Sequence, residues 1–340
     1  MYHQKTDMQT PQGITLPALV LSAADVRGVL DMPTCIGAVE QAFRMLGNGS
    51  APRPVVSSVR TPEGGFHIKS ALFGGYFVSK TNANYPGNAA KHGLPTVQGT
   101  IVVHDASNGV VLAVIDSIEI TAMRTAAATA IAAKYLARED SETLAIVGCG
   151  VQGLYHIRAL SVIRPLRTVC LFDVDRAASA ALERRVQMEF GLSARVASSI
   201  DDAVKEADIT ATCTTSTEFL LDAGAVPPGA FVAGVGVDAE HKRELSPELL
   251  RRARVVADVL EQCAVFGDLH HAIEQGVMTT GDVHAELGAI VAGARPGRTS
   301  RDETFVFDST GMALQDAAAA VLVVERARSN HRGLEVTFSA

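Results

Sequence analysis

Cysteine is scarce in this chain of 340 residues, and the arrangement of its cysteines excludes two kinds of site. No two of them have the C-x-x-C spacing of a zinc or redox motif, and an odd, scattered set does not form a disulfide framework. We therefore expect a reducing, cytoplasmic location. The five are Cys35, Cys149, Cys170, Cys213 and Cys263.

Long apolar runs and basic blocks are also missing. No stretch of 18 or more apolar residues is present, so we predict no membrane span and no membrane partner. The N-terminal residues are polar and lack the apolar core of a signal peptide, and we expect residues 1–14 to form a loose tail. The formal net charge is −7 and no lysine and arginine block resembles a nucleic-acid-binding patch, so nucleic acid is not an expected partner.

The remaining composition suits a soluble globular enzyme. Hydrophobic residues make up 47% of the chain and charged residues 20%, which is enough to bury a large core. At roughly 150 residues per domain, the length suggests about two domains.

A glycine motif directly follows a short apolar strand. Residues 144–147 (LAIV) predict a buried parallel strand, and GCGVQG follows with the pattern G-x-G-x-x-G, ahead of a helical pattern. In such a motif Gly148 permits a tight turn, Gly150 lets a diphosphate approach the backbone, and Gly153 lets helix and strand pack closely. Free N–H groups at the helix start then bind the anion. The motif therefore predicts a dinucleotide cofactor.

An acid at the end of the next strand indicates which dinucleotide is bound. The predicted strand 168–172 ends at Asp173, about 20–25 residues after the glycines, where a carboxylate binds the ribose hydroxyls. Asp175 would repel a 2′-phosphate, so NAD(H) is favoured over NADP(H), although Arg176 offers such a phosphate a partner. The alternative is that Asp173 only caps the following helix.

Strands and helices alternate between residues 140 and 310. This alternation is typical of a Rossmann-type, doubly wound parallel sheet, and the predicted fold class is α/β. The predicted strands are 143–147, 167–172, 208–212, 231–237, 254–258 and 303–307.

The first third of the chain has a different pattern. Two helical segments, 23–30 and 33–47, precede β-rich runs between residues 53 and 116, and no helix long enough for a crossover separates these runs. They predict an α+β domain with an antiparallel sheet. The loop DASNG at 105–109 predicts a hairpin.

Two alanine-rich helices, 118–138 and 311–327, connect these regions. The first leads into the second domain and the last returns the chain to the first. The predicted domains are therefore 1–126 with 315–340, and 127–314.

Three cations are candidates for binding an anionic ligand. Arg124 lies in an alanine-rich helix among residues that otherwise look buried. A buried guanidinium requires a carboxylate partner or an anionic ligand. Arg53 precedes the first strand of the antiparallel region and Lys80 ends an apolar run. Taken singly, Arg53 and Lys80 are better explained as exposed charges.

Two strand ends offer further polar groups. Asp238 follows the apolar run 231–237, at the edge of the sheet where open α/β folds bind ligands, and this position suits it to proton transfer. The alternatives are a helix cap or a partner for Lys242. The turn with Ser309 and Gly311 is placed to face a nicotinamide, although capping explains it equally well.

The histidines do not predict a metal site. His67 shares a strand face with Lys69, and a lone strand histidine is more often structural. His270 and His271 are adjacent in a predicted helix, so we expect them to point apart and not to chelate one ion.

Together these residues resemble the ornithine cyclodeaminase/mu-crystallin family over residues 18–327. ITAMRTAAATAIAAKYLA (120–137) is similar to the family's domain-joining helix and precedes the glycine motif in its G-x-G-x-Q-G form. Three further segments resemble its substrate-lysine, catalytic-aspartate and nicotinamide-facing segments. They are YFVSKTNANYPGN (76–88), VGVDAEHKREL (235–245) and DSTGMALQD (308–316).

The resemblance implies roles for particular residues. Arg53, Lys80 and Arg124 would bind the substrate α-carboxylate, with Lys80 also catalytic, and Thr96 falls where the family has a ligand-contacting threonine. Asp238 would exchange protons with the substrate nitrogen or an attacking water. Domain 127–314 would bind NAD(P), and the other domain would bind substrate and form a homodimer. The complete predicted cofactor site consists of Thr125, Gly148, Gly150, Val151, Gln152, Gly153, Asp173, Thr214, Ser309 and Gly311.

The function implied by the resemblance is an NAD(P)H-dependent reductase of α-imino acids, or in reverse an amino-acid dehydrogenase. One alternative is an ornithine cyclodeaminase, which forms L-proline and ammonia with recycled NAD. Another is a mu-crystallin-like protein that binds a small ligand without catalysis. His67 stands where cyclodeaminases have a glutamate that holds the distal amine, and Lys69-Ser70 replaces a methionine-proline pair, which argues against cyclisation. We include His67 among the substrate-binding residues.

Overall fold

The computed structural model describes residues 17–338, so the predicted tail at 1–14 lies outside the described residues. The chain divides into two compact units. The first contains the residues up to Ala38, Ala51–Thr121 and the residues from Ala313 on, and the second contains Val39–Ser50 and Ala122–Met312.

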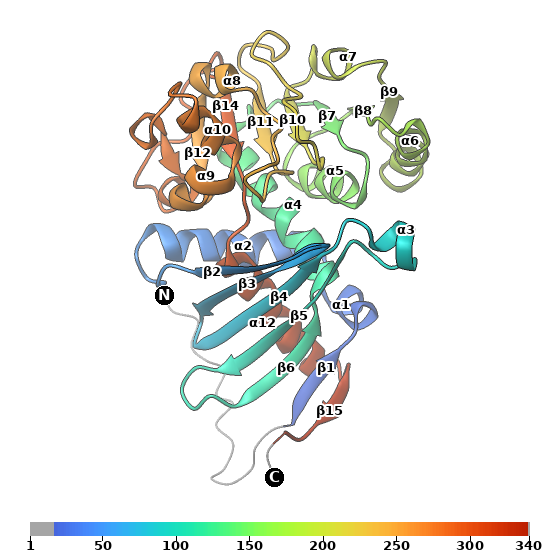
Figure 1. Cartoon of the computed structure of the whole chain (residues 1–340), viewed down its shortest axis with the longest axis vertical. Helices are drawn as coiled ribbons and strands as arrows, with labels where there is room; N and C mark the ends of the chain where they lie inside the picture. The colour runs from blue at the N-terminus through green and yellow to red at the C-terminus, as the bar shows by residue number, and fades with distance from the viewer. Residues whose placement is uncertain (1–16, 339–340) are drawn as a thin grey trace. The chain divides into compact units, whose positions relative to one another are not determined.

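The second unit is built on an eight-stranded sheet of order β13-β12-β14-β11-β10-β7-β8-β9 (Figure 1). Neighbouring strands are parallel throughout, which confirms the predicted doubly wound sheet. The strands are β7 (Thr143–Val147), β8 (Thr168–Phe172), β9 (Ser193–Val196), β10 (Ile209–Thr212), β11 (Phe231–Gly234), β12 (Arg254–Ala257), β13 (Ala285–Glu286) and β14 (Phe305–Asp308).

The strand order places a topological switch point between β7 and β10. From β7 the chain moves outward through β8 and β9, and then returns to β10 on the other side of β7. Ligands of open α/β sheets bind at the carboxyl ends of the strands beside such a point. Every residue of β10, β11 and β14 is buried, as expected of a parallel sheet covered on both faces.

Helices connect these strands. Oγ1 of Thr129 on α4 lies 3.0 Å from Nε2 of His156 on α5. Burial lowers the pKa of His156 to about 4, so this imidazole is neutral. The alanine-rich sequence of α4 allows this close packing because its side chains are small. The helices are α4 (Ser117–Leu136), α5 (Val151–Ile163), α6 (Arg176–Phe190), α7 (Ile200–Val204), α8 (Pro247–Arg252), α9 (Leu260–Phe266), α10 (Asp268–Glu274) and α11 (Leu287–Val291), with a 3₁₀ turn at Thr280–Asp282.

The first unit contains a seven-stranded sheet of order β15-β1-β6-β5-β4-β3-β2. Its strands are β1 (Ala18–Leu21), β2 (Val55–Thr61), β3 (Gly64–Phe73), β4 (Tyr76–Asn84), β5 (Val97–Asp105), β6 (Val111–Asp116) and β15 (Leu334–Val336). Strands β2 to β6 are antiparallel neighbours, and the predicted hairpin joins β5 to β6. The antiparallel prediction missed β1 and β15, and β1 runs parallel to β6.

Besides α4, whose residues Ser117–Thr121 belong to this unit, four helices begin in the described part of the first unit: α1 (Ala23–Val29), α2 (Met32–Gly47), α3 (Asn88–His92) and α12 (Ala313–Ser329). Helix α12 packs on β3 and β4 and covers one face of the sheet (Figure 1). It begins two residues later than predicted because Gly311 has a φ of +78°, which is outside the helical region. None of the helices in the described part of the chain is both long and apolar enough to cross a membrane.

Candidate active site

The glycine loop after β7 has one glycine that the fold itself does not require. Gly148 has a φ of +99°, and a Cβ there would lie 2.7 Å from the carbonyl oxygen of Cys213. A Cβ on Gly153 would lie 2.5 Å from the carbonyl oxygen of Gly148. At Gly150 no described atom lies within 4 Å of an added Cβ. The missing side chain at Gly150 therefore leaves open space at the N-terminus of α5, the kind of position at which helices bind phosphate groups.

The first turn of α5 also fits a bound dinucleotide. Gly150 is the N-cap of α5, and the described residues provide no side-chain cap for the helix. Val151 is 64% exposed. Oε1 of Gln152 is buried and has no hydrogen-bond partner among the described residues. An orphaned acceptor beside uncapped N–H groups is the arrangement expected where a ligand completes the hydrogen bonds.

Asp173, at the end of β8, holds the glycine loop. Its Oδ2 accepts a hydrogen bond from the N–H of Cys149 at 2.7 Å, and its Oδ1 accepts one from the N–H of Asp175 at 2.9 Å. Asp175, not Asp173, is the N-cap of α6, and accepts from the N–H of Ala177. The capping alternative for Asp173 is therefore wrong, and its predicted role at the ribose stays a prediction.

The loops after β10 and β11 carry Thr214 and Asp238. The N–H of Thr214 donates to Oε1 of Glu244 at 2.6 Å. Strand β11 ends at Gly234, three residues earlier than predicted, and the chain then turns into the loop that contains Asp238. Oδ1 of Asp238 lies 2.6 Å from Nζ of Lys242, and the Asp238 side chain is 48% exposed. The pairing with Lys242 is thus present, and proton transfer by Asp238 stays a prediction.

The turn after β14 lies against Arg124. Arg124 and Thr125 of α4 are both buried, and so is Ser309, whose N–H donates to the Gly234 carbonyl. A Cβ on Gly311 would lie 2.6 Å from Nη1 of Arg124. With a larger residue at position 311, the guanidinium would have to move away from this turn.

Asp258, at the end of β12, fixes this turn and was missed by the sequence analysis. Its Oδ2 accepts the N–H of Gly311 at 2.6 Å, and its Oδ1 accepts the hydroxyl of Thr310 at 3.0 Å. The signal was available, because Asp258 is the last residue of the predicted strand 254–258, just as Asp238 directly follows the predicted strand 231–237.

Four acids lie fully buried under these loops: Glu244, Asp258, Asp268 and Asp308. Burial raises the pKa of Asp308 to about 7, against hydrogen bonds from the N–H groups of Leu269 and Asp268. Burial and then the neighbouring charge of Asp308 raise the pKa of Asp268 well above its ordinary value. Burial also raises the pKa of Glu244.

The first unit carries the remaining predicted ligand-binding residues. Lys80 is 2% exposed, which overturns its interpretation as an exposed charge. Its Nζ lies 2.7 Å from Oδ1 of Asp316 on α12 and 3.4 Å from the hydroxyl of Thr121. Lys69 is directly opposite Lys80 in the β3–β4 ladder, so both lie on one face of the sheet. Asp316 was not predicted, although an acid in an apolar helix was a signal.

His67, Arg53 and Thr96 lie elsewhere in the same unit. Nδ1 of His67 is 3.1 Å from the hydroxyl of Ser58 on β2, and His67 is half-buried. Arg53 precedes β2 and is exposed, as expected when this residue is considered by itself. Thr96 is exposed, and its carbonyl accepts the N–H of Tyr85 at 2.9 Å. Their predicted contacts with a ligand stay predictions.

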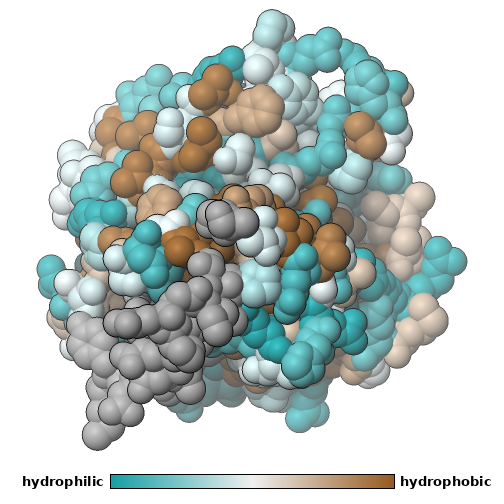
Figure 2. Space-filling model, turned by 90° about the horizontal axis from the view of Figure 1, so that it is seen from below, coloured by the Kyte–Doolittle hydropathy of each residue, from teal (hydrophilic) through white to brown (hydrophobic). Residues whose placement is uncertain are grey.

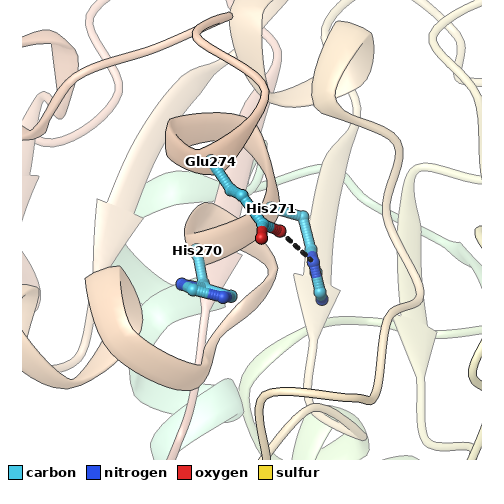
Figure 3. A group of neighbouring side chains, drawn as sticks. All are labelled: His270, His271 and Glu274. Atoms are coloured by element: carbon cyan, nitrogen blue, oxygen red, sulfur yellow. Dashed lines mark ion pairs between the residues drawn. The ribbon is translucent and has the colours of Figure 1, made fainter.

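His270, His271 and Glu274 of α10 form a three-residue group whose potential ligand atoms lie within 4.8 Å of one another (Figure 3). The two rings were expected to point apart, yet their centroids are 5.2 Å apart. Each ring nevertheless donates to a backbone carbonyl, His270 to Ala264 at 3.2 Å and His271 to Lys242 at 2.7 Å. These bonds give both histidines a structural role.

Known proteins are similar to this chain in sequence and in fold. The family model described as "Ornithine cyclodeaminase/mu-crystallin family" matches residues 17–331. Alanine dehydrogenase of Archaeoglobus fulgidus is 34% identical over 323 residues, which cover 95% of this chain and 99% of the relative. A solved archaeal alanine dehydrogenase dimer with bound NAD has a TM-score of 0.92 at 34% identity, and covers 95% of this chain and 100% of its own.

A second solved structure is Δ1-pyrroline-2-carboxylate reductase of Thermococcus litoralis in complex with NADH and L-proline. It has a TM-score of 0.90 at 31% identity and covers 94% of this chain and 100% of its own. These relatives are dehydrogenases and reductases, and the two solved structures contain NAD or NADH, the predicted cofactor. The fold and the relatives therefore define this protein as an oxidoreductase. The chain belongs to the ornithine cyclodeaminase/mu-crystallin family, which confirms the resemblance seen in the sequence.

Proposed function

We propose that this protein is an NAD(H)-dependent reductase of α-imino acids, and in reverse an amino-acid dehydrogenase. The observation that carries the proposal is the buried guanidinium of Arg124, held against Gly311 in the same unit as the glycine loop. A cation so placed suits the carboxylate of a small amino or imino acid. The names of the alanine dehydrogenase and pyrroline-2-carboxylate reductase relatives support this substrate class.

The cations would orient the substrate. Arg53, Lys80 and Arg124 would bind its α-carboxylate, so that the C=N carbon is held in one orientation. The ion pair with Asp316 offsets part of the charge of Lys80, so we expect Arg124 to contribute most of the carboxylate affinity. Positive charge held in place before the reaction stabilises the bound anion without reorganisation.

The cofactor, when bound, supplies the hydride. The orphaned Oε1 of Gln152 and the open space at Gly150 fit it, and Asp173, Val151 and Thr214 complete the expected set with Gly148, Gly153, Thr125, Ser309 and Gly311. Asp238, or a water that it holds, would deliver or receive the proton at the substrate nitrogen. Oδ1 of Asp238 lies 2.6 Å from Nζ of Lys242, so a cation lies directly beside the carboxyl group proposed to exchange this proton.

The surroundings of His67 do not favour cyclodeamination. His67 contacts Ser58, and Lys69 and Lys80 lie on the same strand face. A second substrate ammonium would meet positive charge there, which disfavours a diamino acid.

We further propose a homodimer in a reducing cytoplasm, where the five free cysteines would stay reduced. The sheet face opposite α12 exposes six large apolar side chains, Val55, Val59, Phe66, Ile68, Leu72 and Phe77. Figure 2 shows apolar residues reaching the surface in clusters on one face of the molecule. Apolar patches of this kind mark interaction surfaces. Light scattering of Ile68→Glu should give the monomer mass, and a wild-type monomer would refute the dimer.

Arg124→Ala tests the carboxylate role directly. We expect kcat/KM for Δ1-pyrroline-2-carboxylate to fall about 100-fold or more, with loss of the preference over 1-pyrroline, which lacks the carboxylate. Lys134→Ala is the matched control, because Lys134 is a 47% exposed cation of the same helix. Equal rates for Arg124→Ala and wild type would remove the basis of the proposal.

A further inference from the structure

Glu244 joins the two loops that follow β10 and β11. Its side chain is fully buried. Oε1 accepts the N–H of Thr214 at 2.6 Å, and Oε2 accepts the N–H of Gly236 at 2.8 Å. Oε2 also accepts the hydroxyl of Thr212 at 2.7 Å. One carboxyl group therefore satisfies a backbone donor from each loop.

The two loops are packed tightly around this carboxyl. A Cβ on Gly236 would lie 2.2 Å from the carbonyl oxygen of Thr214 and 2.5 Å from Oε1 of Glu244. The N–H of Val235 donates to the Thr212 carbonyl at 3.1 Å, which continues the β10–β11 ladder into the loops. A shift of the Glu244 side chain would thus move both loops.

The backbone of Glu244 is itself fixed by α10. Oδ1 of Asp268 accepts the N–H groups of Glu244 and Leu245 at 2.8 and 3.0 Å. His271, one turn along the same helix, donates to the carbonyl of Lys242 at 2.7 Å. Helix α10 therefore holds the segment 242–245 at both ends.

The loops joined by Glu244 border the predicted cofactor and proton-transfer residues. The loop after β10 contacts the glycine loop, because a Cβ on Gly148 would lie 2.7 Å from the Cys213 carbonyl. The loop after β11 leads directly to Asp238 and receives a bond from Lys242 to the Gly236 carbonyl. We propose that Glu244 is a positioning residue, which sets the spacing of these two loops for NADH binding and for Asp238. This inference rests on the proposed function.

Glutamine cannot replace Glu244 in this role. An amide has one acceptor oxygen, and the two backbone donors approach different carboxyl oxygens. Whichever way the amide is turned, its NH₂ group faces the N–H of Thr214 or that of Gly236. Glu244→Gln should therefore loosen one loop while changing the side-chain volume little.

Calorimetry of NADH binding and amide hydrogen exchange test the proposal without turnover. We expect Glu244→Gln to weaken NADH binding at least about tenfold and to speed exchange at residues 213–216 or 235–238. Thr212→Val is the matched control, because it removes one bond to Oε2 and leaves both backbone bonds. We expect it to change NADH affinity by less than about threefold.

The proposal is overturned if Glu244→Gln binds NADH as wild type does and exchanges at wild-type rates in both loops. If this variant does not fold, Glu244→Asp replaces it with the same expectations, since it keeps a carboxyl group but draws its oxygens back by one bond. Neither readout involves the amino-acid substrate. Failure of imine reduction in the wild type would therefore count against the proposed function and not against the role of Glu244.

Discussion

The ammonium nitrogen of Lys80 lies 2.7 Å from Oδ1 of Asp316, and the two side chains are only 3% and 1% exposed. The pair ties β4 to α12 across 236 positions of sequence. A buried charge that loses its partner retains its full desolvation cost.

We predict that Asp316→Asn lowers the free energy of unfolding by about 3 kcal/mol, because Lys80 stays buried beside a neutral group. Lys80→Met should cost a similar amount, and the double variant Lys80→Met/Asp316→Asn less than the sum of the two. Urea unfolding of the four proteins measures the coupling. Strictly additive losses would contradict a coupled pair.

Gly311→Ala should impair substrate binding through Arg124. The new Cβ would lie 2.6 Å from Nη1, so the guanidinium must move, and we expect the KM for the imino acid to rise about tenfold or more. Steady-state kinetics measures this. Gly293→Ala is the control for backbone strain, since its φ of +79° matches the +78° of Gly311 but its Cβ would meet nothing within 4 Å. Equal KM values in both variants would refute the link to Arg124.

Gly150→Ala should separate cofactor binding from folding. The added methyl meets no described atom, so Tm should stay close to that of wild type while NADH affinity falls about tenfold or more. Gly153→Ala, in contrast, should lower Tm, because its Cβ would lie 2.5 Å from the carbonyl oxygen of Gly148. Calorimetry and thermal unfolding give both quantities. Unchanged NADH affinity in Gly150→Ala would argue against a diphosphate at this helix start.

Asp308 should lower the free energy of unfolding as the pH rises from 4 to 7, whereas most acids of folded proteins raise it over this range. Burial raises its pKa to about 7, so the folded state binds this proton more tightly than the unfolded state does. Its contribution is therefore complete below about pH 4 and is lost as the pH rises to 7, at about 1.4 kcal/mol per unit while the group titrates. Asp308→Asn should lack this loss in denaturant unfolding between pH 4 and 7.

Asp222→Asn provides the comparison, because it removes an exposed acid of the same unit. Its stability profile should run parallel to that of wild type. A parallel profile for Asp308→Asn as well would contradict the raised pKa of Asp308.

Local sequence patterns predicted the strands that are continuous apolar runs between turns. They missed β1 and β15, which pair with each other although they lie at opposite ends of the chain. Such short strands form because a distant partner satisfies their backbone groups, and no local pattern records that partner.

The sequence predicted the site residues that belong to a local motif. It did not predict roles that depend on whether a side chain is buried. Gly148 and Gly153 follow from the spacing of the glycine motif alone. Asp238 and Asp258 both stand at the ends of predicted strands, yet the first is exposed in the loop after β11 and the second, directly after β12, is fully buried. Which acid turns inward depends on backbone donors from remote segments, such as the N–H of Gly311 for Asp258. The sequence therefore predicted strand-end acids as a class without distinguishing ligand contacts from loop supports.

The central claim is most directly tested by following NADH and product together with Δ1-pyrroline-2-carboxylate as substrate. We predict oxidation of one NADH for each L-proline formed, with turnover also on piperideine-2-carboxylate or on pyruvate with amines. Release of ammonia from ornithine without net change in NADH, and no NADH oxidation with any of these imines, would contradict the account.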